Sequence, residues 1–61
     1  MRYILEAKLP VGWKKSIYDR PLESLSQKRL EAEYRAGQGW RPYRVVRGKK
    51  VVYRPRFTAR P

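Results

Sequence analysis

Two short runs of valine and tyrosine mirror each other near the end of the chain, and they constrain the fold more than any other feature. Segment 43–54 reads YRVVRGKKVVYR, so a YRVV run is mirrored by VVYR across a central RGKK. Val and Tyr favour strands, and a glycine at the first central position of a two-residue loop suits a type II′ turn. The sequence therefore predicts an antiparallel hairpin whose mirror-image residues face each other, from Val46–Val51 to Tyr43–Arg54.

Because side chains alternate along a strand, this pairing gives the predicted hairpin two different faces. The face expected to pack against the rest of the domain holds Trp40, Pro42, Arg44, Val46, Val51, Tyr53, Pro55 and Phe57. The other face holds Arg41, Tyr43, Val45, Arg47, Lys50, Val52, Arg54 and Arg56. Five cations cannot be buried together, so we expect the second face to meet water or a polyanion. A three-residue loop would shift the register and exchange residues between the faces.

The beginning of the chain predicts a second hairpin. Residues 2–9 alternate as in a strand, and the PVG sequence at 10–12 is typical of a turn. Residues 13–18 then form the second strand, with Trp13 and Ile17 on the same face. The apolar side of the first strand consists of Tyr3, Leu5, Ala7 and Leu9.

Residues 19–39 form the helical candidate. Asp19 or a residue close to it can cap the helix, and Ser24 with Gln27 offers a capping box that would start it later. The glycines of GQG mark its end. The stripe expected to face the sheet consists of Leu22, Leu25, Ala32 and Ala36.

Together these elements predict an α+β fold, a small antiparallel sheet in the order β-β-α-β-β with one helix packed on one face. We expect a single small domain over residues 1–57 and a frayed tail at 58–61. Trp40 is assigned to the core, because it shares a face with Val46 and Val51.

The composition argues against an enzyme. The chain has no cysteine and no histidine, which removes disulfides, the usual zinc ligands and most nucleophile and general-base pairs. We therefore expect neither a metal nor a cofactor. The helical carboxylates Glu23, Glu31 and Glu33 read as surface partners of Lys28, Arg29 and Arg35. Since no apolar run approaches about 20 residues, a soluble cytoplasmic protein without a membrane partner is expected.

Charge is the strongest indication of function. The 16 Lys and Arg residues exceed the five Asp and Glu residues by 11 charges. All five acids lie in residues 1–33 beside seven cations, whereas residues 34–61 hold nine cations and no acid. Such an asymmetry favours a polyanionic partner, most often nucleic acid.

We therefore expect a small, basic, non-enzymatic protein that binds DNA or RNA mainly through phosphate contacts. The candidate contact residues on the basic face and its turn are Arg41, Tyr43, Arg47, Lys49, Lys50, Arg54 and Arg56. Arg and Lys neutralise phosphates, and an exposed tyrosine between arginines suits stacking on an unpaired base. Tyr43 has an alternative structural role, in which it covers the Arg54 side chain across the strands.

The rival hypothesis is a phage-type modulator or inhibitor that docks on an acidic surface of a host enzyme. In that case the same arginines would meet carboxylates, and Trp13, Trp40 or Tyr43 would anchor the interface. Possible partner contacts beside the first turn are Trp13, Lys14 and Lys15. A nucleic acid and an acidic protein are thus alternative partners, and the sequence specifies neither DNA against RNA nor an oligomeric state.

Segment 24–55, SLSQKRLEAEYRAGQGWRPYRVVRGKKVVYRP, resembles the recognition-helix-plus-wing half of small winged-helix proteins such as phage excisionases. The shared pattern is a helix, a glycine-containing turn and a short basic hairpin. This resemblance implies that Gln27, Lys28 and Arg35 enter a DNA major groove. It also implies that the Lys49–Lys50 turn meets the minor groove or the backbone. The N-terminal half departs from the pattern, because it reads as strands where a first helix is required.

Overall fold

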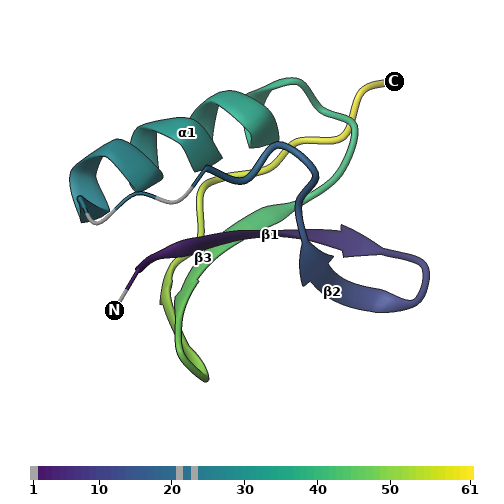
Figure 1. Ribbon diagram of the computed structural model, residues 1–61. Helices are drawn as coiled ribbons and strands as arrows, with labels where there is room; N and C mark the ends of the chain where they lie inside the picture. The colour runs from purple at the N-terminus through teal and green to yellow at the C-terminus, as the bar shows by residue number, and fades with distance from the viewer. Residues whose placement is uncertain (1, 21, 23) are drawn as a thin grey trace.

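A four-stranded antiparallel sheet carries one helix across one of its faces in the computed structural model, which describes residues 2–20, 22 and 24–61 (Figure 1). The elements in chain order are β1 (Ile4–Leu9), β2 (Gly12–Lys15), α1 (Leu25–Gly37), β3 (Tyr43–Arg47) and β4 (Lys50–Tyr53). The order in the sheet is β2-β1-β3-β4, and each neighbouring pair is antiparallel. The predicted α+β class, with a small antiparallel sheet and one helix, is confirmed.

The N-terminal hairpin is confirmed, with a shorter second strand than predicted. Leu9 pairs with Gly12, so two residues form the turn, and Gly12 adopts a positive φ of 114° that favours glycine. Strand β2 ends at Lys15, and Ile17 lies beyond it, exposed. Trp13 therefore shares no strand face with Ile17.

Small side chains on α1 bring the helix close to the sheet. The buried core consists of Leu5, Ala7, Ala32, Ala36, Tyr43 and Val45. Tyr3, Leu25, Val52 and Tyr53 pack around it, partly buried. Ser24 caps the helix, since its hydroxyl accepts the Gln27 backbone N–H at 3.3 Å. This confirms the later of the two predicted helix starts.

The C-terminal hairpin follows the predicted register only near its turn. Arg47 pairs with Lys50 and Val46 with Val51, as expected, but Val45 then pairs with Tyr53 across a β-bulge. The extra residue in the bulge is Val52. The predicted pairs Val45–Val52, Arg44–Tyr53 and Tyr43–Arg54 are therefore wrong.

The predicted faces of β3 are also wrong, whereas Tyr53 of β4 packs against the core as expected. Strand β1 pairs Leu5 with Val45 and Ala7 with Tyr43, so all four side chains lie on the side that α1 covers. Arg44 lies on the opposite, helix-free face. Burying Tyr43 and Val45 against the helix removes more apolar surface from water than burying the arginine would, and this packing decides the orientation.

Trp40 lies outside the core, contrary to the prediction, and is 67% exposed. It follows Gly39, whose positive φ of 79° turns the chain between α1 and β3. The segment after β4 runs up to this turn, where the Arg60 backbone N–H donates to the Gly39 carbonyl at 2.9 Å (Figure 1). No helix in the described part of the chain has the length and apolar character that a membrane crossing requires.

Tyr53 connects β4 to α1 through its hydroxyl, which donates to the Glu33 carboxylate. This hydrogen bond raises the pKa of Tyr53, and burial and the negative charge of Glu33 act in the same direction. The guanidinium of Arg29, 4.7 Å from the ring centroid, opposes the shift with a smaller effect.

We expect this contact to make stability fall at high pH. A raised pKa in the folded state means that the contribution of Tyr53 is complete below its unfolded pKa of about 10. The contribution disappears as the pH rises through the higher folded value. Urea unfolding at about pH 9 and at about pH 11 measures the free energy of unfolding at each pH. Between these two pH values, this free energy should fall less for Tyr53→Phe than for the wild type. An equal decline in both proteins would show that other groups cause it.

Candidate nucleic-acid interface

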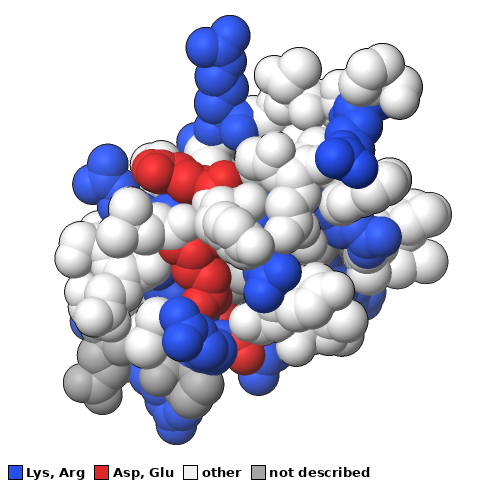
Figure 2. Space-filling model, turned by 90° about the horizontal axis from the view of Figure 1, so that it is seen from above, with Lys and Arg blue, Asp and Glu red and all other residues white. Residues whose placement is uncertain are grey.

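The described carboxylates are all held by donors within the protein. Glu6 accepts the Arg44 Nε–H at 2.8 Å, and Asp19 and Glu31 both accept from the Lys28 ammonium. The remaining carboxylate, Glu33 on α1, accepts a hydrogen bond from the Tyr53 hydroxyl of β4. On the helix side of the molecule the carboxylates form separate patches with Lys and Arg side chains beside them (Figure 2). Little negative charge is therefore left to neutralise other cations.

Lys28 is the centre of a buried ion-pair cluster. Its side chain is fully buried, and its Nζ contacts Asp19 Oδ1, the Arg20 carbonyl oxygen and, at 3.1 Å, Glu31 Oε1. Asp19 also accepts the Leu5 backbone N–H at 2.9 Å. The cluster therefore fastens α1 to the loop after β2 and to β1.

This cluster corrects two expectations about Lys28. The predicted pairing with a helical carboxylate is confirmed for Glu31, but the pair is buried and not on the surface. Because its side chain is buried, Lys28 cannot enter a DNA major groove as the winged-helix resemblance implied. The N-terminal half also departs from that family, because β1 and β2 belong to the same sheet as the C-terminal hairpin. Glu23, the third carboxylate predicted to form surface pairs, lies outside the described residues.

The cations predicted to bind nucleic acid are exposed. These residues are Arg41, Arg47, Lys49, Lys50, Arg54 and Arg56. None of them forms an ion pair with a carboxylate among residues 2–20, 22 and 24–61. Arg47 lies over the Tyr3 ring, 5.3 Å from its centroid, and donates to the tyrosine hydroxyl at 3.3 Å.

The exposed cations lie at the two ends of the C-terminal hairpin. Those at the β3–β4 turn, the tip group, are Arg47, Lys49 and Lys50. Those where the chain enters β3 and leaves β4, the tail group, are Arg41, Arg54 and Arg56. The predicted continuous basic face is thus replaced by two clusters on one hairpin.

The aromatic residues differ most from the prediction. Tyr43 is 6% exposed and belongs to the core, so it cannot stack on a base from the surface. Trp13 is half-buried on the helix-free face, between the Lys8 ammonium at 5.7 Å and the Arg44 guanidinium at 4.3 Å from its ring centroid. Lys14 and Lys15 are exposed on the neighbouring edge strand β2.

Trp40 is an exposed aromatic residue that the sequence reasoning assigned to the core. The Arg60 guanidinium lies over its ring, 4.6 Å from the centroid. The sequence signal for its exposure is the GQG that precedes it, because a glycine-rich turn breaks the alternation used to assign it to a strand face.

Comparison of the chain with protein-family models, with curated protein sequences and with solved structures finds no match.

Proposed function

We propose that this protein is a non-enzymatic nucleic-acid-binding protein that holds phosphates with the tip and tail groups of its C-terminal hairpin. One observation carries the proposal. Residues 34–61 contain nine cations and no acid, and the six cations of the two groups are exposed without a described carboxylate partner. Unpaired surface cations are the groups that phosphates neutralise, with release of condensed counterions.

The cations that already pair with carboxylates are less suited to bind phosphate, and this supports the choice of the tip and tail groups. Lys28 is buried among its partners, and Arg44 is held by Glu6. Releasing either would leave a carboxylate without its partner, which adds to the cost of any new contact. The tip and tail groups have no such cost, and a basic hairpin tip is narrow enough to approach a groove of a duplex.

We expect neutralisation of the tail group to weaken binding and reduce its salt dependence. Arg54→Gln/Arg56→Gln removes two exposed cations beyond β4, so the slope of log K against log salt should become shallower by about two. Fluorescence anisotropy with labelled duplex DNA, single-stranded DNA and an RNA hairpin measures this slope at several salt concentrations. The form bound most tightly identifies the substrate class.

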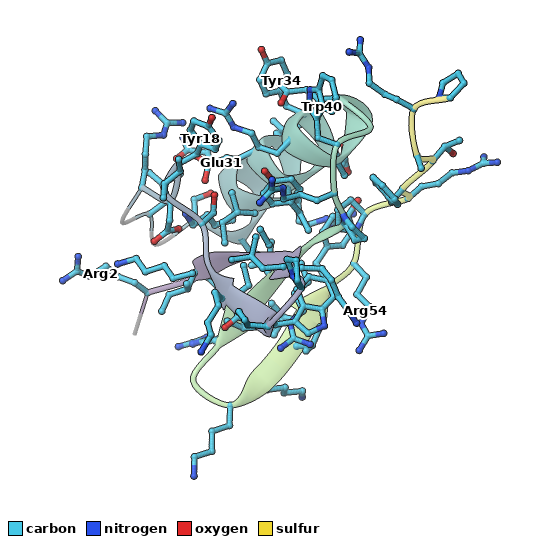
Figure 3. All side chains as sticks on the ribbon, turned by 90° about the vertical axis from the view of Figure 1, so that its right-hand side faces the viewer. Arg2, Tyr18, Glu31, Tyr34, Trp40 and Arg54 are labelled. Carbon is cyan, nitrogen blue, oxygen red and sulfur yellow. The ribbon has the colours of Figure 1, made fainter. Side chains whose placement is uncertain are left out.

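The matched control is Arg2→Gln/Arg29→Gln, which changes the net charge equally. Both arginines are exposed, and Arg2 projects from the side of the molecule opposite to Arg54 (Figure 3). The control should keep a slope close to that of the wild type. If both double variants lose binding equally, the net charge and not the hairpin is responsible. If the wild type binds none of the three nucleic acids at low salt, an acidic protein surface becomes the favoured partner.

A further inference from the structure

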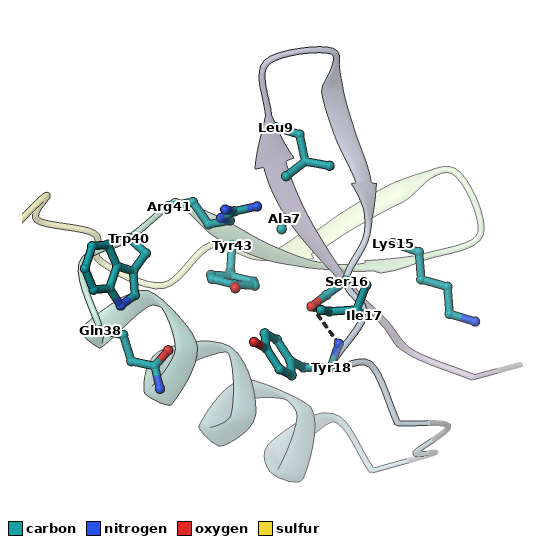
Figure 4. A pocket seen from close by; sticks show the side chains of 10 residues that line it. All are labelled: Ala7, Leu9, Lys15, Ser16, Ile17, Tyr18, Gln38, Trp40, Arg41 and Tyr43. Carbon is teal, nitrogen blue, oxygen red and sulfur yellow. Dashed lines mark hydrogen bonds between the residues drawn. The ribbon is translucent and has the colours of Figure 1, made fainter.

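A cavity of about 220 Å³ opens between the N-terminal hairpin, the loop after β2 and the turn after α1 (Figure 4). Among the ten residues that line it are Ala7, Tyr18, Gln38, Trp40, Arg41 and Tyr43. We call it the aromatic cavity, because three aromatic rings, from Tyr18, Trp40 and Tyr43, line it. In Figure 4 the rings of Trp40 and Tyr18 lie on different sides of Tyr43.

The aromatic walls remain open to solvent. Trp40 is exposed and Tyr18 is 47% exposed, and the Arg60 and Arg35 guanidinium groups each lie over one of these rings. Large aromatic side chains at such exposure leave apolar surface in water, which a flat apolar ligand would remove.

Polar groups in the cavity can recognise the edge of a ligand. The Tyr18 and Tyr43 hydroxyls and the Gln38 side-chain amide make no hydrogen bond within the described residues. The Ser16 hydroxyl is already engaged, since it accepts the Tyr18 backbone N–H at 3.1 Å. An amide and two hydroxyls provide both donors and acceptors, as the edge of a heteroaromatic ring requires.

The volume limits what can enter. Sites for complete small-molecule ligands usually occupy about 300–1,000 Å³, and the aromatic cavity is smaller. It therefore suits one planar ring system of a larger ligand whose remainder lies on the protein surface.

The surroundings of the cavity favour an anionic ligand. Arg41, a member of the tail group, lines it, and the Arg60 guanidinium lies on the Trp40 ring. The Arg35 guanidinium lies 3.9 Å from the Tyr18 ring centroid. None of the ten lining residues is an acid. A ligand with a flat ring and neighbouring negative charges fits this combination.

We propose that the aromatic cavity binds one unpaired nucleobase of a single-stranded nucleic acid, while Arg41 and the rest of the tail group hold the adjoining phosphates. The inference rests on the proposed function and narrows it to strands with accessible bases. Stacking on Trp40 and Tyr18 provides base affinity without a strong sequence preference, since every base has a flat ring surface. A duplex hides its bases, so it would use the phosphate contacts alone.

The test compares two oligomers with equal numbers of phosphates. One is a fluorescein-labelled oligothymidylate of about 12 nucleotides, a length within the usual range for single-strand sites. The other has the same length but lacks bases throughout. We expect the wild-type protein to bind the oligothymidylate at least about fivefold more tightly, the lower limit for stacking of one base.

Two variants test whether the preference for the oligothymidylate over the oligomer without bases arises in the aromatic cavity. Trp40→Ala should remove most of it, and Tyr34→Ala should retain it, because Tyr34 is a comparably exposed aromatic residue that does not line the cavity. Circular dichroism checks that both variants fold. A preference that survives in Trp40→Ala would overturn the assignment to this cavity.

The wild-type comparison also separates this inference from the proposed function. Equal binding of both oligomers with a steep salt dependence would overturn the cavity proposal and leave phosphate binding intact. Failure of both oligomers to bind at low salt would overturn both proposals.

Discussion

Lys28→Met is expected to destabilise the fold by about 3–5 kcal/mol, the usual cost of removing one partner from a buried ion pair. Methionine preserves the length of the side chain but has no charge and no N–H donor. The variant would remove the buried ammonium from Asp19 and Glu31, whose side chains are 4% and 8% exposed, and leave them only Lys15 at 3.9 Å and Arg20 at 3.0 Å, both exposed. The Arg20 carbonyl oxygen would lose the same donor. Water cannot easily replace these contacts at such burial.

The effect is large relative to the whole domain. At about 0.05–0.15 kcal/mol per residue, a chain of this length has a total stability of about 3–9 kcal/mol. Urea unfolding followed by circular dichroism should therefore show a much lower midpoint than the wild type, and no cooperative transition if the wild-type stability lies at the lower end of this range. Lys14→Met is the matched control, since it makes the same change at an exposed lysine of β2 that forms no ion pair with a described carboxylate, and it should cost less than about 0.5 kcal/mol. Similar midpoints for the two variants would show that the cluster contributes little.

Local sequence signals were sufficient to predict the helix and the strands. The glycine and proline residues of the N-terminal turn, the valines that flank the RGKK loop and the Ser24 cap each act over a few neighbouring residues. Their consequences depend on backbone geometry and single hydrogen bonds, which the sequence specifies directly. The α+β class followed from them.

The faces of the C-terminal hairpin could not be predicted in this way. The two Val-Val pairs look symmetric, yet one extra residue, Val52, shifts the pairing and brings Tyr53 to the same side as Val45. A strand has a period of two, so a single inserted residue reverses every later side chain. What favours the bulge is packing of Tyr53 against α1, a contact between segments 20 residues apart.

The sequence predicted which cations of the candidate site are exposed. It did not predict where the aromatic residues lie. Exposed cations follow from the cost of burying charge, which is a local argument. Lys28 is the exception, because partners from the loop before the helix make its burial possible. Trp40 is the converse case. The turn at Gly39 and the returning tail place it beside the aromatic cavity, and no periodic pattern describes that arrangement.

Wild-type binding is expected to fall about a thousandfold on duplex DNA between about 50 mM and about 200 mM salt. Six neutralised phosphates, one for each cation of the tip and tail groups, give a slope of about −5 in log K against log salt. On a single strand the slope should be about −4, because fewer counterions are condensed on it. Anisotropy titrations over this salt range measure both slopes. A slope near −3 on the duplex, or near −2 on the single strand, would mean that only one of the two groups binds phosphate.

The salt series also separates the contribution of the phosphates from that of the base. Counterion release disappears at high salt, whereas stacking in the aromatic cavity involves no release and should persist. The affinity extrapolated to about 1 M salt should therefore be higher for the single strand than for the duplex, although the duplex has the steeper slope. Trp40→Ala should lower the extrapolated single-strand value and leave its slope unchanged. Arg54→Gln/Arg56→Gln should do the opposite, because it removes phosphate contacts and leaves the cavity walls in place. Parallel changes in slope and intercept for both variants would contradict this division of roles between the tail group and the aromatic cavity.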